Sequence, residues 1–189
     1  MSDLLATRVQ KCGVQSKRGE SILSEHDDQA NQPDQPEKGK VQVGGKMPNF
    51  TLPSQFGALV SLSAFLGKQY VVLYFYPKDS NSICTAQACA FRDRYKDFKR
   101  LGAEVIGISS DSVESHRQFS EEHQLPFILL SDTGGIIRKR FGVPTSFGLP
   151  GRVTYIIDRQ GFVRHLFFSQ YTAEKHVAEA IRVLQSIQC

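Results

Sequence analysis

The sequence lacks the features that mark three large classes of protein. Its apolar runs are short, such as VVLYFY at residues 71–76, and none approaches the roughly 20 residues that a membrane span requires. Lysine and arginine form no block of the kind that binds nucleic acid, although the net charge is +4 and the isoelectric point is near 8.9. No internal repeat is evident, and 40% hydrophobic side chains in 189 residues are enough for the core of one domain.

Cysteine is scarce, and the N-terminal region lacks the apolar core of a secretory signal. The same region is too acidic for an organelle transit peptide, so we expect a cytoplasmic location. In a reducing compartment, a close pair of cysteines is more often catalytic or metal-binding than structural. Residues 1–40 are polar and offer too little apolar surface to offset the entropy of ordering, which predicts a disordered tail before a globular domain at residues 41–189.

Hydrophobic periodicity predicts that strands and helices alternate through this domain. Strands are expected at two short segments within residues 49–67 and at residues 70–77, 103–111, 126–132, 152–158 and 161–168. Helices are expected at residues 82–101, from a cap at Asp111 to residue 123, and at residues 134–143 and 173–187. This order predicts an α/β protein with the thioredoxin-like fold, in which helices flank a central mixed sheet and an extra N-terminal β-hairpin is present.

Cys84 and Cys89 follow the buried strand at residues 70–77 and lie near the start of the helix at residues 82–101. Unpaired backbone N–H groups and the positive end of the helix dipole favour the thiolate form of Cys84 at such a position. In an intact helix the two Cα atoms would be about 8–9 Å apart, whereas a disulfide requires less than about 7 Å. Either the pair never forms a disulfide, or the first turns of the helix unwind when it does.

Three interpretations of this pair are compatible with its spacing. A thiolate that attacks peroxide becomes a sulfenic acid, with which a second thiol can condense to a disulfide. Two cysteines on one helix are also often small buried hydrophobic residues. A zinc site would need two more ligands, which Cys12, Cys189 and the five histidines do not supply at suitable spacing, so no metal is expected. His116 and His123 are expected at the surface.

The segment FYPKD, with CTAQACAFRD after it, resembles the active-site segment of the peroxiredoxins, specifically the peroxiredoxin Q group, also called bacterioferritin comigratory protein. The likeness extends from about residue 41 to the end of the chain, and it includes the segments LPFILLSD, FGV and GRVTYIID. It implies a thioredoxin-like fold and a thiol-dependent peroxidase that needs no cofactor and no metal.

The resemblance also implies a role for each residue that matches a family motif. Pro77 and Cys84 match the motif of Pro, three residues, Thr, two residues and then the peroxidatic Cys. Cys84 is therefore expected to be the peroxidatic cysteine and Cys89 the resolving cysteine, joined in an intramolecular disulfide during turnover. Arg152 matches the family arginine, whose guanidinium would stabilise both the thiolate and the leaving oxygen. Asn81 occupies the position of the family threonine.

The loop before Cys84 departs from the family pattern. The group usually reads Asp-x-Thr-Pro-Gly-Cys, whereas this chain reads DSNSIC at residues 79–84. Asn81 replaces a hydroxyl with an amide, and Ser82 and Ile83 alter the freedom of the backbone and narrow the approach to the sulfur. We therefore expect slower turnover or a different peroxide preference.

The resemblance implies that hydrogen peroxide and organic hydroperoxides are the substrates and that thioredoxin, or a similar dithiol, is the reductant. Because both thiols lie on one chain, nothing requires a dimer, and a monomer is expected. Plant members of the group reside in plastids, so a plastid is the alternative location. The alternative functions are a peroxide sensor and a low-activity binding protein that keeps the fold and the cysteines.

Overall fold

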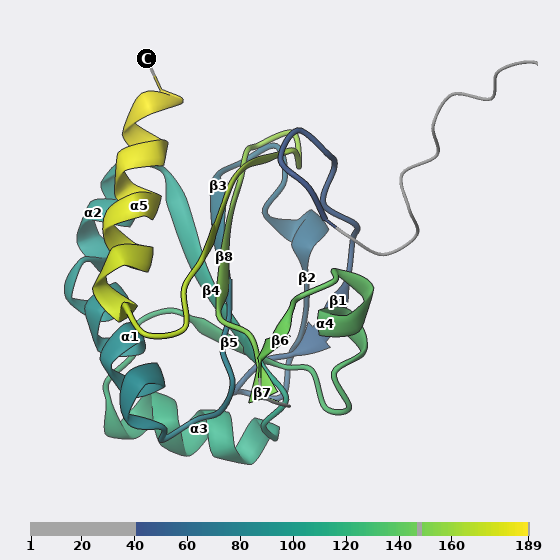
Figure 1. Cartoon of the computed structure of the whole chain (residues 1–189), viewed down its shortest axis with the longest axis vertical. Coiled ribbons are helices and arrows are strands. Elements are labelled where there is room, and N and C mark those ends of the chain that lie inside the picture. The colour runs from purple at the N-terminus through teal and green to yellow at the C-terminus, as the bar shows by residue number, and fades with distance from the viewer. Residues whose placement is uncertain (1–40, 147–148, 189) are drawn as a thin grey trace, which may run out of the picture. The chain divides into compact units, whose positions relative to one another are not determined.

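The structure is a computed structural model that describes residues 41–146 and 149–188. The predicted tail at residues 1–40, with Cys12, and the C-terminal Cys189 lie outside the described residues. A five-stranded sheet with strand order β5-β4-β3-β8-β9 forms the centre (Figure 1). Its strands are β3 (Tyr70–Phe75), β4 (Ala103–Ser109), β5 (Ile128–Ser131), β8 (Val153–Ile157) and β9 (Val163–Phe168). β3, β4 and β5 are parallel, whereas β8 and β9 pair antiparallel, so the sheet is mixed.

Helices and a hairpin cover the two faces of this sheet (Figure 1). One face carries α1 (Ser82–Asp93), α2 (Tyr95–Arg100), α3 (Val113–Glu122) and α5 (Ala173–Ser186). The other face carries β1 (Thr51–Pro53), β2 (Leu59–Ser61), the 3₁₀ turn η1 (Leu62–Ala64) and α4 (Ile136–Arg140). A short hairpin of β6 (Thr145–Ser146) and β7 (Leu149–Pro150) precedes β8.

Coverage of both faces explains why β3 is an unbroken apolar run. Val72 and Tyr74 pack into the core beneath α1 and α5, whereas Val71 and Leu73 pack into the core beneath the N-terminal hairpin and α4. The predicted thioredoxin-like α/β fold, including the antiparallel β1–β2 hairpin, is confirmed. None of the helices in the described part of the chain is long and apolar enough to cross a membrane.

The single helix expected at residues 82–101 is wrong in one respect, because a break at Arg94 divides it into α1 and α2. Arg94 has non-helical backbone angles of φ −104° and ψ 8°. Beyond the break, α2 lies against β4, where Tyr95 donates a hydrogen bond to Glu104 at 2.7 Å and Phe98 is fully buried. Packing against the sheet therefore overrides the continuous helical pattern.

Two predictions about polar residues near α3 are also wrong. Ser112, rather than Asp111, caps α3, because its hydroxyl oxygen accepts the backbone N–H of Ser115 at 3.2 Å. His116, expected at the surface, is fully buried, and its ring lies 2.8 Å from the Asp79 carboxylate, which supplies a buried polar partner. α3 therefore turns a polar side chain toward the core at this position.

Candidate active site

Two segments far apart in the sequence meet at the carboxyl end of β3. The chain leaves β3 at Phe75 and enters α1 at Ser82, and Cys84 lies in the first turn of this helix. β8 runs antiparallel beside β3 with Val153 opposite Phe75, which brings Arg152 to the same end of the sheet. There the Nη2 of Arg152 donates a hydrogen bond to the Sγ of Cys84 at 3.3 Å.

Cys84 and Arg152 are both enclosed by the protein, with only 1% and 2% of their surfaces exposed. The attraction between a guanidinium and a thiolate is stronger where water is excluded. The N-terminus of α1 adds its positive dipole at the same sulfur. The guanidinium of Arg152 and the N-terminus of α1 therefore both lie at the sulfur of Cys84.

Cys89 lies further along α1, which is continuous from Ser82 to Asp93 and contains both thiols. Cys89 is half-buried, and both Cys84 and Cys89 are free thiols. Five residues apart in a wound helix, the two Cα atoms are roughly 8–9 Å apart, which is too far for a disulfide. A bond between them therefore requires the first turns of α1 to unwind.

Asn81 is the N-cap of α1. Its side-chain Oδ1 accepts the backbone N–H groups of Ile83 at 3.1 Å and Cys84 at 3.3 Å. The N–H of Cys84, which lies among the backbone N–H groups predicted to be unpaired at this helix start, is therefore hydrogen-bonded to Asn81. The cap satisfies donors that are otherwise unpaired at a helix start and stabilises the wound form of α1.

The neighbouring residues of the loop lie around this cap. Pro77 is half-buried just beyond β3, where its missing N–H ends the strand ladder. Ser80 and Ser82 are exposed, whereas Cys84 is buried, so neither hydroxyl is enclosed with the sulfur. Ser80 also has a φ of +56°, a left-handed conformation that is uncommon for residues with a side chain.

Gln87 is a site residue that the sequence analysis missed. Its Oε1 accepts a hydrogen bond from the Nη1 of Arg152 at 2.6 Å, and the residue is fully buried. The Nε2 of Gln87 has no hydrogen-bond partner among the described residues. The sequence does offer one sign of this role, since Gln87 is an amide in the CTAQAC segment, about one helical turn after Cys84. It also lies beside Ala88 and Phe91, which belong to the buried apolar stripe of the helix.

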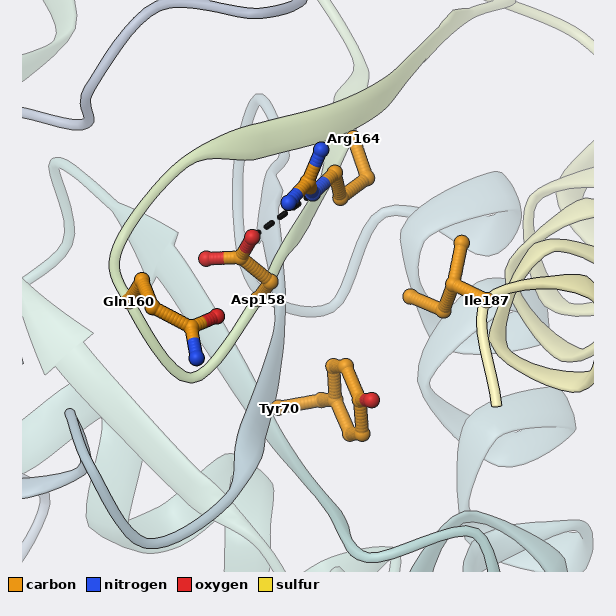
Figure 2. Close-up of a pocket in the computed structure, with 5 residues that line it drawn as sticks. All are labelled: Tyr70, Asp158, Gln160, Arg164 and Ile187. Carbon is orange, nitrogen blue, oxygen red and sulfur yellow. Dashed lines mark hydrogen bonds and ion pairs between the residues drawn. The ribbon is translucent and has the colours of Figure 1, made fainter. Parts of the chain in front are cut away.

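A pocket of about 330 Å³ lies at the other end of the sheet (Figure 2). It is lined by Tyr70, Asp158, Gln160, Arg164 and Ile187, and Arg164 donates to Asp158 across 2.6 Å. Tyr70 begins β3, whereas Cys84 follows the end of this strand. This pocket is therefore separate from the thiol site.

No group of three or more His, Cys, Asp or Glu residues in the described part of the chain is arranged to hold a metal ion. The reactive centre is instead a buried thiol beside a guanidinium, at the carboxyl end of a central strand in a thioredoxin-like sheet. Fold and site together define a redox protein whose chemistry is carried by sulfur.

Comparisons with known proteins assign this redox protein to a family. The AhpC/TSA family model matches residues 43–166. The chain is 53% identical over 151 residues to "Peroxiredoxin Q, chloroplastic" of Oryza sativa subsp. japonica, which covers 79% of this chain and 69% of the relative. "Peroxiredoxin Q, chloroplastic" of Sedum lineare is also 53% identical, with 79% of this chain and 81% of the relative covered.

Solved structures agree with this result. Peroxidoxin BcpB from Mycobacterium tuberculosis superposes with a TM-score of 0.74 at 34% identity, covering 79% of this chain and 99% of that chain. Peroxiredoxin Q from Xanthomonas campestris superposes with a TM-score of 0.67 at 27% identity, covering 72% and 90%. The chain belongs to the AhpC/TSA family, within its peroxiredoxin Q group, and it is a thiol-dependent peroxidase.

Proposed function

We propose that Cys84 is the peroxidatic cysteine of this enzyme and that Arg152 is its catalytic partner. The observation that carries the proposal is the 3.3 Å hydrogen bond between the Arg152 guanidinium and the buried Cys84 sulfur. The thiolate attacks one peroxide oxygen, so that an S–O bond forms as the O–O bond breaks. The second oxygen leaves as water or alcohol after taking up a proton, and Arg152 stabilises the negative charge that develops on it.

Cys89 completes the cycle as the resolving cysteine in this proposal. Once the start of α1 unwinds, the Cys89 thiolate attacks the sulfur of the Cys84 sulfenic acid, and a disulfide forms as hydroxide leaves and is protonated to water. A dithiol reductant then restores both thiols by exchange, and we propose thioredoxin in this role. The proposal is supported by the free state of both thiols and by their shared position on α1.

Asn81 distinguishes this site from the usual family pattern. We propose that its Nδ2 donates to the bound peroxide while its Oδ1 remains the cap of α1, so that one amide serves binding and helix stability together. Because the Oδ1 holds the N–H of Cys84, less donor capacity is left for the substrate, which supports the expected slower turnover.

Three further features belong to the proposal. We propose residues 1–40 as a tail and residues 41–189 as the catalytic domain, which acts as a monomer because both thiols lie on one chain. Hydrogen peroxide and organic hydroperoxides are the proposed substrates, and alkyl peroxide reduction is an activity of the structurally similar bacterioferritin comigratory protein of Xanthomonas campestris. The expected cytoplasmic location is not confirmed, and the relatives named chloroplastic support the plastid alternative.

The test compares peroxide consumption by the wild-type protein and by Cys84→Ser, each supplied with reduced thioredoxin. The wild-type protein should consume many equivalents of peroxide, and the variant should show only the background rate. Equal slow rates in both proteins would reject the role of Cys84. A wild-type protein that consumes a single equivalent and then stops would indicate the sensor function instead.

A further inference from the structure

A cluster of polar groups is hydrogen-bonded to Asp79 in the loop between β3 and α1. The Asp79 carboxylate is 3% exposed and accepts hydrogen bonds from the Tyr76 hydroxyl and the Ser115 hydroxyl, both at 2.7 Å. The Nδ1 of His116, which is fully buried, lies 2.8 Å from the Asp79 Oδ2. The chemistry proposed for Cys84 uses none of these groups.

His116 is held on both sides of its ring. The Nδ1 faces the Asp79 carboxylate, and the Nε2 faces the backbone carbonyl of Leu130 at 3.2 Å. The ring therefore links the loop before α1 to the backbone of β5.

Asp79 is the carboxylate at the centre of this cluster. Burial raises the pKa of the Asp79 carboxyl, but hydrogen bonding to His116, the electrostatic attraction of His116, and the hydroxyls of Tyr76 and Ser115 together lower it below its usual value of 3.8. Asp79 and His116 form a buried hydrogen-bonded pair. Removal of one partner is destabilising, because the other polar group stays buried without its hydrogen bond.

The Asp79–His116 pair fixes the backbone that leads into α1. Asp79 lies two residues before the cap at Asn81, and its own N–H donates to the Asp111 carboxylate at 2.8 Å. The intervening Ser80 holds its left-handed φ of +56° only while both sides of it are fixed. The loop is thus anchored to α3 through His116 and to the end of β4 through Asp111.

We propose that Asp79 and His116 are a positioning pair for Cys84. By holding the loop, the pair places Asn81 where it caps α1, and it sets how often the first turn of α1 unwinds. Because the disulfide of the proposed function requires this unwinding, the pair also sets how fast an oxidised Cys84 meets Cys89. Neither Asp79 nor His116 contacts the reacting sulfur among the described contacts, so their effect passes through the loop.

Amide hydrogen exchange of the reduced protein, without peroxide, tests this proposal separately from the proposed function. The reporters are the N–H groups of Cys84 and Thr85, which bond to the side chain and the carbonyl of Asn81. In Asp79→Asn and in His116→Gln, exchange at these reporters should rise at least about tenfold relative to exchange in the centre of β3. The double variant should add little to either single variant, because both changes remove one interaction.

Glu104→Gln is the matched control. Glu104 is also a nearly buried carboxylate that accepts a tyrosine hydroxyl at 2.7 Å and pairs with Lys99 at 3.0 Å, but it lies at the start of β4, far from Cys84. This control should not raise exchange at the reporters relative to β3. Ser115→Ala is a milder variant that keeps the contact between Asp79 and His116 and should raise exchange at the reporters about threefold.

Three results would overturn the proposal: equal reporter exchange in Asp79→Asn and Glu104→Gln, exchange that rises uniformly over the whole molecule, or fully additive effects of the two substitutions. Formation of the disulfide after a single addition of peroxide is measured in parallel. If reporter exchange rises while this rate is unchanged, the positioning role stands, and it is the proposed unwinding step of the catalytic cycle that is contradicted.

Discussion

Arg152 can hold its position beside Cys84 because its other nitrogens are bound. The Nη1 donates to Gln87 at 2.6 Å and the Nε donates to the carbonyl of Gln170 at 3.4 Å, so the guanidinium plane is fixed on two sides. A planar group with several donors keeps its orientation only when they are satisfied together. Gln87 is therefore a positioning residue, which orients Arg152 through a single hydrogen bond.

Replacement of Gln87 by leucine tests this role. Gln87→Leu removes the acceptor of the Arg152 Nη1 and replaces it with an apolar side chain of similar size, so the rate of Cys84 oxidation by hydrogen peroxide should fall about tenfold. Gln87→Glu keeps an acceptor oxygen and should retain most of the rate. The rate constant is measured by competition for hydrogen peroxide, and an unchanged rate in Gln87→Leu would contradict the positioning role.

The residues of the site were predictable to the extent that their chemistry is visible locally. Cys84 and Cys89 stand out by their spacing after an apolar strand, and Arg152 by its resemblance to the family arginine. Gln87 and His116 do not stand out, because each is a polar residue on a helix and is ordinarily solvated there. Their burial follows from partners 65 and 37 residues away, which no local pattern contains.

At the scale of elements, α1 has two requirements that oppose one another. It is wound where it places Cys84 against Arg152, and in the proposed cycle it must unwind to bring Cys84 to Cys89. The Asn81 cap contributes on the order of 1 kcal/mol to the wound form. The proposed peroxidase cycle therefore depends on a helix start that is stable, yet less stable than the sheet beneath it.

Most elements were predictable because their apolar period is strong. The buried run of β3 and the apolar face of α5, with Val177, Ile181 and Leu184, correspond to the expected segments. The break at Arg94 was not predictable, because the apolar stripe continues across it from Phe91 to Phe98 in helical steps. Packing against β4 sets the direction of α2 after the break, and this is a tertiary effect that a local pattern does not contain.

At the scale of the whole molecule, His176 links folding to pH. It joins α5 to β8, where its Nδ1 accepts from the Thr154 hydroxyl at 2.8 Å and its Nε2 donates to the Ser169 carbonyl at 2.9 Å. Burial is the main cause that lowers the pKa of His176 to about 4. The hydrogen bond to the Ser169 carbonyl raises this pKa by a smaller amount, and the positive charge of Arg152 lowers it further. The folded protein therefore holds this ring neutral well below pH 6.5.

Stability should accordingly decrease as the pH falls from about 6.5 to about 4. In this window the unfolded chain binds a proton at His176 that the folded chain does not, which favours unfolding by about 3 kcal/mol at the lower end. Urea unfolding at a series of pH values should show this slope in the wild-type protein and a much smaller slope in His176→Gln. Equal slopes in the two proteins would exclude His176 as the source. The contribution of Asp79 is lost only below pH 3.8, outside this window.

In the proposed cycle, Cys84 takes the oxygen from peroxide and Cys89 then forms a disulfide with Cys84. The most direct measurement is a peptide mass map of the protein after one equivalent of hydrogen peroxide, with free thiols blocked before digestion. Most molecules should then carry a disulfide between Cys84 and Cys89. A disulfide that joins Cys84 to Cys12 or Cys189, or a consumed equivalent of peroxide that leaves Cys84 a free thiol, would contradict it.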